Sequence, residues 1–281
     1  MIAVILSLLS ATAYGLSDFV GGVLSKRASP WSVALVGQLA GAVLVLGLTT
    51  VTSGTPTAAH LGWAVVAGVG NGLGTAFLYR GFASGRMGVV APVSGVGAAL
   101  VPVAAGLAGG ERPSGLVWVG IVAALPGIWL VAREPTAPGS AGAPAAASGL
   151  VDGVWAGLGF GSLFAALGQI PDSAGFFPLA LNQMVAAAVV VLAAVLLRAP
   201  WVPRSRAAAA GVVTGVLGTL ATGAFLLASQ QGLLTVTSVL ASLYPAVTVV
   251  LAATVLREHV HRPQAVGLLL CGVAVACVAA G

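Results

Sequence analysis

A single acidic residue lies inside the first apolar run of the chain, where a charge is costly. Asp18 ends a polar series whose spacing places it on one face of a helix. The series consists of Ser7, Ser10, Tyr14, Ser17 and Asp18. A carboxylate at the centre of a bilayer costs roughly 2.5–3.5 kcal/mol on insertion scales, so such a residue normally faces protein or a water-filled cavity. We predict that Asp18 either takes up and releases a proton or pairs with a cationic group of a substrate.

The alternative for Asp18 is an acid near a helix end that a basic side chain neutralises. Lys26 follows it by about two helical turns. Arg80 is expected near the same membrane side, so a buried Asp18–Arg80 pair is one candidate. Arg80 can instead anchor its helix at the cytoplasmic interface, where arginine side chains extend toward the headgroups. We favour the anchor, and the sequence leaves both roles open.

Polar side chains in other apolar runs can line a transport path or link helices to one another. Asn71, Thr75 and Tyr79 follow one another in steps of four, so they share a helix face. For Asn71 we favour a link between helices, because small residues surround it. The full set of candidate substrate-binding or coupling residues is Tyr14, Ser17, Asp18, Asn71, Thr75, Tyr79, Ser94, Thr222, Ser242 and Tyr244.

Residue types that carry enzymatic or metal chemistry are scarce and poorly spaced. Cys271 and Cys277 are six residues apart and point to different faces of a helix. The three histidines lack zinc-ligand spacing. Glu111 and Glu258 lie in turns beside arginine, where ion pairing or helix capping is the expected role. We therefore expect no catalytic residue, no metal and no cofactor, and the chain is not predicted to be an enzyme.

The composition requires a bilayer around the elements that carry these residues. Hydrophobic residues make up 59% of the chain and charged residues 6%, with a mean hydropathy of +1.09. A soluble domain carries roughly a quarter charged residues, so this chain is unable to cover a surface that faces water. The eleven lysines and arginines lie near the ends of apolar runs instead of forming a patch. Nucleic-acid binding is therefore not expected.

Ten apolar runs are long enough to cross a bilayer, and the second five repeat the first. The spans are predicted at residues 2–24, 31–52, 61–84, 88–109, 115–132, 151–169, 176–198, 207–231, 235–256 and 263–280. Residues 1–132 form the first repeat, 133–150 a flexible linker and 151–281 the second repeat. An offset of about 147 aligns Glu111 with Glu258 and Gly120 with Gly267. The fold class is an all-α membrane protein of ten helices.

Each half has an odd number of spans, so the two halves must insert with opposite orientations. This inverted-repeat organisation is typical of secondary transporters, which bind substrate between the repeats near the midplane. The odd-numbered loops and the adjoining helix ends hold ten lysines and arginines, whereas the even-numbered loops hold Arg112 alone. This bias predicts cytoplasmic odd loops and termini outside the cell.

The chain resembles the EamA-type transporters of the drug/metabolite transporter superfamily. The resemblance rests on LYRGFASGRMGVVAP (78–92), on GGERPSGLVWVGIVAALPGIWLVAR (109–133) and on REHVHRPQAVGLLLCGVAVACVA (257–279). It implies two five-helix repeats and a multi-pass carrier of the inner or plasma membrane that exports small metabolites. It also implies cytoplasmic termini, in conflict with the charge bias, so the orientation stays open.

The function predicted from the sequence is secondary transport of small organic metabolites by alternating access, with export as the direction and a proton as the coupling ion. The expected partners are a small-molecule solute, the lipid bilayer and the proton, in a monomer or a homodimer. A membrane-embedded enzyme and a lipid-handling or structural subunit are the alternatives. An enzyme would need clustered acids or histidines, whereas a lipid-handling protein would tolerate a wholly apolar cavity.

Overall fold

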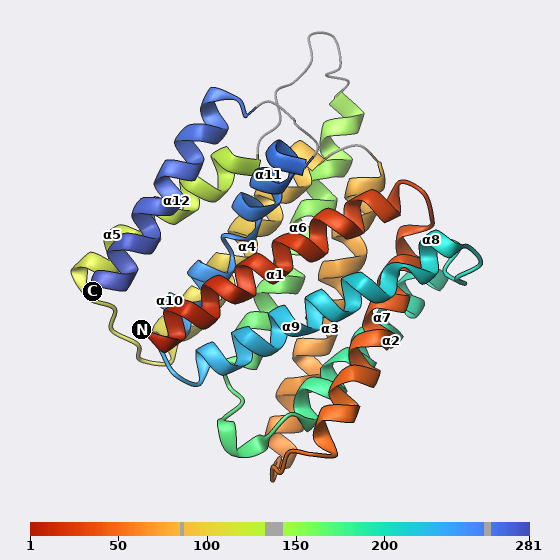
Figure 1. Cartoon of the computed structure of the whole chain (residues 1–281), viewed down its shortest axis with the longest axis horizontal. Coiled ribbons are helices and arrows are strands. Elements are labelled where there is room, and N and C mark those ends of the chain that lie inside the picture. The colour runs from red at the N-terminus through yellow and green to blue at the C-terminus, as the bar shows by residue number, and fades with distance from the viewer. Residues whose placement is uncertain (85–86, 133–142, 256–259) are drawn as a thin grey trace.

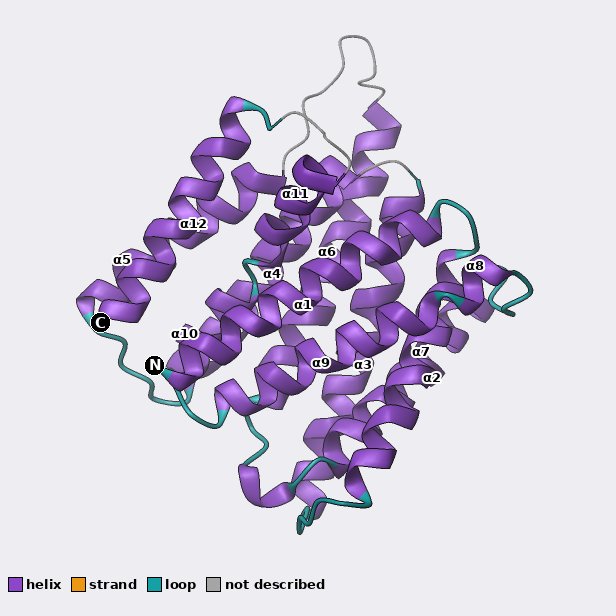
Figure 2. Cartoon of the chain, viewed as in Figure 1, coloured by secondary structure: helices purple, strands orange, loops and turns teal. Residues whose placement is uncertain are grey.

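A computed structural model describes residues 1–84, 87–132, 143–255 and 260–281, and these residues form helices without a strand (Figure 2). The first half contains α1 (Ile2–Ser25), α2 (Pro30–Thr49), α3 (Ala58–Ala83), α4 (Met87–Ala108) and α5 (Gly115–Ala132). The second half contains α6 (Ala143–Leu167), the short 3-10 helix η1 (Asp172–Ala174), α7 (Phe177–Leu196), α8 (Arg206–Ala209), α9 (Gly211–Ser229), α10 (Leu234–Ala241), α11 (Tyr244–Val255) and α12 (Arg262–Ala280).

The helices account for ten membrane spans, as the sequence predicts. Within the described residues, eight stretches are long and apolar enough to cross a bilayer. In these, α8 runs into α9, and α10 into α11. The shorter apolar stretches Val93–Ala108 and Gly115–Val131, in α4 and α5, supply the other two. The chain is therefore a multi-pass membrane protein.

Span nine differs from the single continuous helix predicted over residues 235–256. Pro245 has no N–H to donate to the carbonyl of Ala241, and its ring crowds that carbonyl. The backbone N–H of Leu243 consequently bonds three residues back, to Leu240 at 3.2 Å, and the helix restarts at Tyr244. The first half has Ala98 at the aligned position, and α4 continues through it. The break thus belongs to one repeat only.

The sixth span begins earlier than the sequence predicts. Helix α6 starts at Ala143, within the segment that composition assigns to the linker. Three consecutive alanines at 145–147 explain the difference, because alanine has the highest helix propensity. Residues 133–142 of the predicted linker lie outside the described residues.

The two halves pack against each other as a two-fold arrangement requires. Helix α3 packs on α6, and the equivalent pair is α1 on α9. Helix α4 packs on α6, and the equivalent contact is that of α1 with α10 and α11. Helix α3 packs on α7, and the equivalent contact is that of α2 with α9. Helices α5 and α12 pair with each other at one edge of the bundle (Figure 1). Most helix contacts are therefore made between the repeats.

Glycines at aligned positions allow these equivalent contacts. A Cβ atom on Gly120 would lie 3.0 Å from the carbonyl oxygen of Ala274, and one on Gly267 would lie 2.8 Å from that of Gly127. Ala274 and Gly127 are themselves 147 residues apart. Small residues let helix backbones approach closely in a bilayer. The sequence repeat is thus a repeat of packing contacts.

Both chain ends lie at the same end of the bundle (Figure 1). A chain that crosses the membrane an even number of times returns to the side on which it began. The membrane side on which they lie stays a prediction, with the charge bias and the family resemblance in disagreement.

The glycine contacts can be tested on α12 with a matched pair of variants. Gly267→Ala should lower the free energy of unfolding by about 1–3 kcal/mol, because its Cβ would meet the backbone of α5. Gly272→Ala, on the same helix, meets nothing within 4 Å. It should be neutral or stabilise by up to about 1 kcal/mol. Unfolding in mixed detergent micelles measures both, and equal effects would contradict the packing argument.

Candidate functional site

A cavity with polar side chains lies between the repeats, and the space in and above it that no protein atom fills, open solvent included, is about 400 Å³. Three helices of each half line it: α1, α2 and α3 from the first, and α6, α7 and α9 from the second. Its polar lining residues are Tyr14, Ser17, Asp18, Gln38, Asn71, Thr75, Tyr79, Gln183, Thr214, Thr219 and Thr222. The remaining lining residues are Ala34, Gly37, Phe160, Gly215 and Gly218.

The frame of this cavity is built from residues at equivalent positions of the two repeats. Tyr14 and Phe160 occupy equivalent places on α1 and α6. Gln38 is paired in the same way with Gln183, and Thr75 with Thr222. All six residues line the cavity. The cavity therefore lies where the two halves meet, the position at which inverted-repeat carriers bind their substrates.

A hydrogen-bond network of amide side chains joins four helices at one side of the cavity. Gln38 and Asn71 exchange hydrogen bonds of 3.2 and 3.3 Å between their amide groups. Asn71 also donates to Oε1 of Gln183 at 2.7 Å, and Gln183 donates to Oγ1 of Thr219 at 2.5 Å. These bonds connect α2, α3, α7 and α9. The interhelical role that we favour for Asn71 is thus present, and the residue lines the cavity as well.

Asp18 is the acidic residue among the lining side chains that the structure describes. Its exposed fraction is 6%, and it forms no ion pair with any described residue. No hydrogen bond from a described side chain reaches its carboxylate either. The aligned residue of the second half is Phe164, so the charge breaks the two-fold symmetry of the frame. The two repeats therefore contribute equivalent helices to the cavity, but only the first repeat contributes a carboxyl group to its described lining.

The tyrosines form an aromatic wall next to Asp18. The hydroxyl of Tyr14 bonds with Thr222 at 2.7 Å, and its ring lies 6.2 Å from that of Tyr244. Tyr244 does not line the cavity but bonds with Ser94 at 3.2 Å behind it. Tyr79, on α3, lies against Gly21 of α1, where a Cβ would collide with its phenol.

The structure brings most of the predicted site residues together. Those that line the cavity are Tyr14, Ser17, Asp18, Asn71, Thr75, Tyr79 and Thr222. Ser94 and Tyr244 form a second layer behind Tyr14. Ser242 lies apart from the cavity lining, fully buried at the break between α10 and α11, and its hydroxyl has no partner in the described structure.

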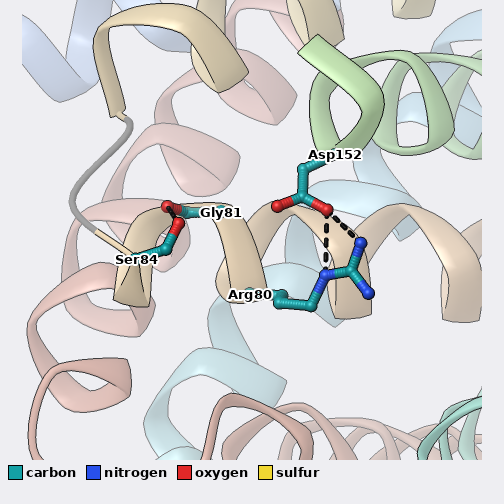
Figure 3. Close-up of polar contacts among 4 residues, drawn as sticks. All are labelled: Arg80, Gly81, Ser84 and Asp152. Carbon is teal, nitrogen blue, oxygen red and sulfur yellow. Dashed lines mark hydrogen bonds and ion pairs between the residues drawn. The ribbon is translucent and has the colours of Figure 1, made fainter. Parts of the chain in front are cut away.

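The proposed pair between Asp18 and Arg80 does not form. The Nε atom of Arg80 donates to Asp152 at 2.9 Å, and one terminal nitrogen contacts the same oxygen (Figure 3). The guanidinium also lies 4.4 Å from the ring centre of Phe77. Tyr79 and Arg80 are neighbours on α3 and point about 100° apart, so Tyr79 faces the cavity while Arg80 faces α6. Asp152 lies at the start of the sixth apolar run, and an acid within a predicted span was the signal that could have identified it.

Glu111 has the structural role that the sequence favoured. Its two carboxylate oxygens accept hydrogen bonds from the backbone N–H groups of Leu234 and Thr235, at 2.5 and 2.8 Å. These donors are at the first turn of α10, where a helix N-terminus attracts negative charge. Glu111 thus joins the first half to the second. Glu258 lies outside the described residues.

Four polar lining residues were missing from the predicted site. Gln38 and Gln183 were identifiable, because two amides recur at matching places in the second span of each half. Thr214 and Thr219 lie on α9 within one or two turns of Thr222, so helical spacing from Thr222 was the available signal. Neither pattern distinguishes a cavity residue from a helix contact without the neighbouring helices.

Comparisons with known proteins cover nearly the whole chain. The model of the EamA-like transporter family matches residues 1–133 and again residues 147–280. A solved crystal structure, whose title names it only as a protein, aligns with a TM-score of 0.66 at 16% sequence identity. That alignment covers 95% of this chain and 98% of the other, and at this identity it shows a shared fold. No curated protein matches the chain.

A double-mutant cycle tests the pairing of Arg80. Arg80→Gln, Asp152→Asn and the double variant should give a coupling energy of about 1–3 kcal/mol, because the pair is in contact and the carboxylate is buried. The matched cycle with Arg80→Gln and Asp18→Asn should show coupling below about 0.5 kcal/mol. Free energies of unfolding in mixed micelles provide the measurement. A larger coupling to Asp18 than to Asp152 would restore the rejected pair.

Proposed function

The chain belongs to the EamA-like transporter family, and from this premise we propose that it is a secondary transporter of small organic metabolites that works by alternating access. The observation that carries the proposal is the polar cavity between the repeats, lined by three helices from each half. In inverted-repeat carriers, one half rocks against the other around a site at their interface. Export from the cell is the proposed direction, as the family resemblance implies.

A carrier rather than an enzyme is supported by the chemistry of the lining residues. The described lining contains one carboxylic acid, hydroxyl groups and amides, and the amides are bonded to one another. General acid–base chemistry relies on groups that exchange protons with the reacting atoms, most often histidine or paired acids. A lipid-handling role would suit an apolar cavity, whereas five of the six helices that line this cavity contribute a polar side chain. We therefore propose transport and place the alternatives second.

Asp18 is the proposed coupling residue. The titratable lining side chains that face it are Tyr14, from its own helix, and Tyr79, from α3. Tyr244 of α11 lies behind Tyr14. The described lining residues of α2, α6, α7 and α9 include no ionisable group. A carboxyl group in this position can bind one proton, or one positive charge of a solute, and release it when the cavity opens to the other side.

The direct test is transport by the purified chain in proteoliposomes. Labelled amino acids, amines, organic acids, nucleosides and sugars should be presented with and without an imposed pH gradient. We expect at least one class to accumulate above the level in protein-free liposomes, and to accumulate further when the gradient is imposed. If no class moves above that level, the transport proposal fails for the solutes tested.

Neutralising Asp18 should uncouple the carrier. Asp18→Asn retains the size of the side chain but is unable to exchange a proton, so accumulation driven by the pH gradient should fall to the protein-free level. Asp172→Asn is the matched control, because it removes an exposed acid at η1, outside the membrane spans. Gradient-driven accumulation that is unchanged in Asp18→Asn would exclude Asp18 from coupling.

A further inference from the structure

The polar groups of the cavity differ in whether their hydrogen-bond donors or their acceptors remain free to bind a solute. Hydroxyl groups carry one hydrogen each, and several lining hydroxyls donate theirs to the protein. Thr214 donates to the carbonyl of Gly211 at 2.8 Å, and Thr222 to that of Gly218 at 2.7 Å. Ser17 donates to the carbonyl of Thr214 at 3.1 Å. The oxygens of these side chains therefore remain as hydrogen-bond acceptors.

Counting hydroxyl hydrogens in the same way identifies the donor in the hydrogen bond between Tyr14 and Thr222. Since Thr222 gives its hydrogen to Gly218, the 2.7 Å contact between the two hydroxyls must be donated by Tyr14. The phenol oxygen of Tyr14 then keeps only acceptor capacity. Thr75 likewise donates to Oδ1 of Asn71 at 3.3 Å. Five hydroxyl oxygens, from α1, α3 and α9, can thus act as acceptors in the cavity.

The amide N–H groups of the cavity also donate within the protein. The amide nitrogens of Gln38, Asn71 and Gln183 are directed to one another and to Thr75 and Thr219. Asp18, when ionised, is an acceptor only. It is buried at 6% exposure and has no donor among the described side chains. A buried carboxyl group remains ionised only when a cation or hydrogen-bond donors satisfy it, and otherwise it takes up a proton.

Aromatic rings complete the environment of the carboxylate. Tyr14, Tyr79 and Phe160 line the cavity, and their faces can attract a cation that has lost its water. Among the described lining residues none carries a positive charge. The site therefore has one negative charge, several hydroxyl oxygens whose own hydrogens are already donated within the protein, and three aromatic rings.

We propose that the solute of this cavity is a small protonated amine, whose ammonium group binds Asp18 and the neighbouring hydroxyl oxygens. The inference rests on the proposed transport function and names the class of substrate. An ammonium group supplies the positive charge that the described lining lacks, together with N–H donors for these hydroxyl oxygens. Anions would face Asp18 without a compensating cation. An uncharged amide would satisfy the acceptors but leave the carboxylate without a counter-charge.

Binding to the detergent-purified chain tests the class of solute without requiring transport. Butylamine, butyramide and butyrate have similar size but are cationic, neutral and anionic at neutral pH. We expect butylamine alone to raise the unfolding temperature and to give a binding isotherm by calorimetry. Tetramethylammonium, which has the charge without N–H donors, should bind more weakly than butylamine. Binding of butyrate or butyramide in preference to butylamine would overturn the proposal.

Variants assign the binding to Asp18. Asp18→Asn should weaken butylamine binding tenfold or more, because it removes one member of a buried charge pair. Asp18→Glu should recover part of the affinity, and Asp172→Asn should match the wild type. Butylamine affinity that is unchanged in a folded Asp18→Asn variant would contradict the proposal. Should Asp18→Asn fail to fold, Tyr14→Phe replaces it: loss of the acceptor oxygen should weaken butylamine severalfold, and unchanged affinity would count against the site.

The two proposals fail in different ways. If butylamine binds through Asp18 but no solute crosses the bilayer, the transport proposal fails and the amine site stands. If solutes cross the bilayer but butylamine neither binds nor inhibits them, the chain is a carrier for another class and the amine proposal fails.

Discussion

Close contact between helix backbones is the interaction on which this structure depends. Lipid tails are as apolar as leucine side chains, so apolar burial alone does not draw helices together in a bilayer. Here the helix backbones contact each other at small residues, and these contacts occur at aligned positions of the two repeats. A Cβ atom on Gly15 would lie 2.9 Å from the carbonyl oxygen of Tyr244, and one on Gly161 would lie 2.7 Å from that of Gly97. Gly120 and Gly267 repeat the arrangement at the edge of the bundle. These contacts hold one repeat against the other and leave the cavity between them.

The chemistry of the chain departs from this two-fold order. Asp18 is aligned with Phe164, and Pro245 with Ala98. The pair between Arg80 and Asp152 also lacks a counterpart, because the residues aligned with them are Leu227 and Leu6. Scaffold positions are therefore shared between the halves, while charges and helix breaks are specific to one. A site between the repeats whose described lining carries a single acid can hold a single positive charge, in agreement with the proposed amine site.

Among the described residues, two links that involve charged side chains join the repeats away from the cavity. Arg80 binds Asp152 between α3 and α6, and Phe77 supports the guanidinium. Glu111 binds the N-terminus of α10 from the loop after α4. Charged groups in or near a membrane are costly unless they are paired or bonded, so both links remove that cost while they connect the halves. Neither link contributes a residue to the cavity lining. The charged side chains that connect the repeats are therefore separate from Asp18.

The amino-acid sequence by itself determined the membrane setting, the ten spans and the repeat, because apolar length and self-similarity are properties of the chain alone. It also identified Asp18, since an acid in a span requires an explanation. Most of the predicted site followed from helical spacing. Which face of α3 meets which helix was decided only by tertiary packing, and this directs Arg80 to Asp152 instead of Asp18. The same packing places Gln38 and Gln183 in one network, although 145 residues separate them. Helical period gives the direction of a side chain relative to its own axis, but the identity of its neighbour depends on how the two repeats dock.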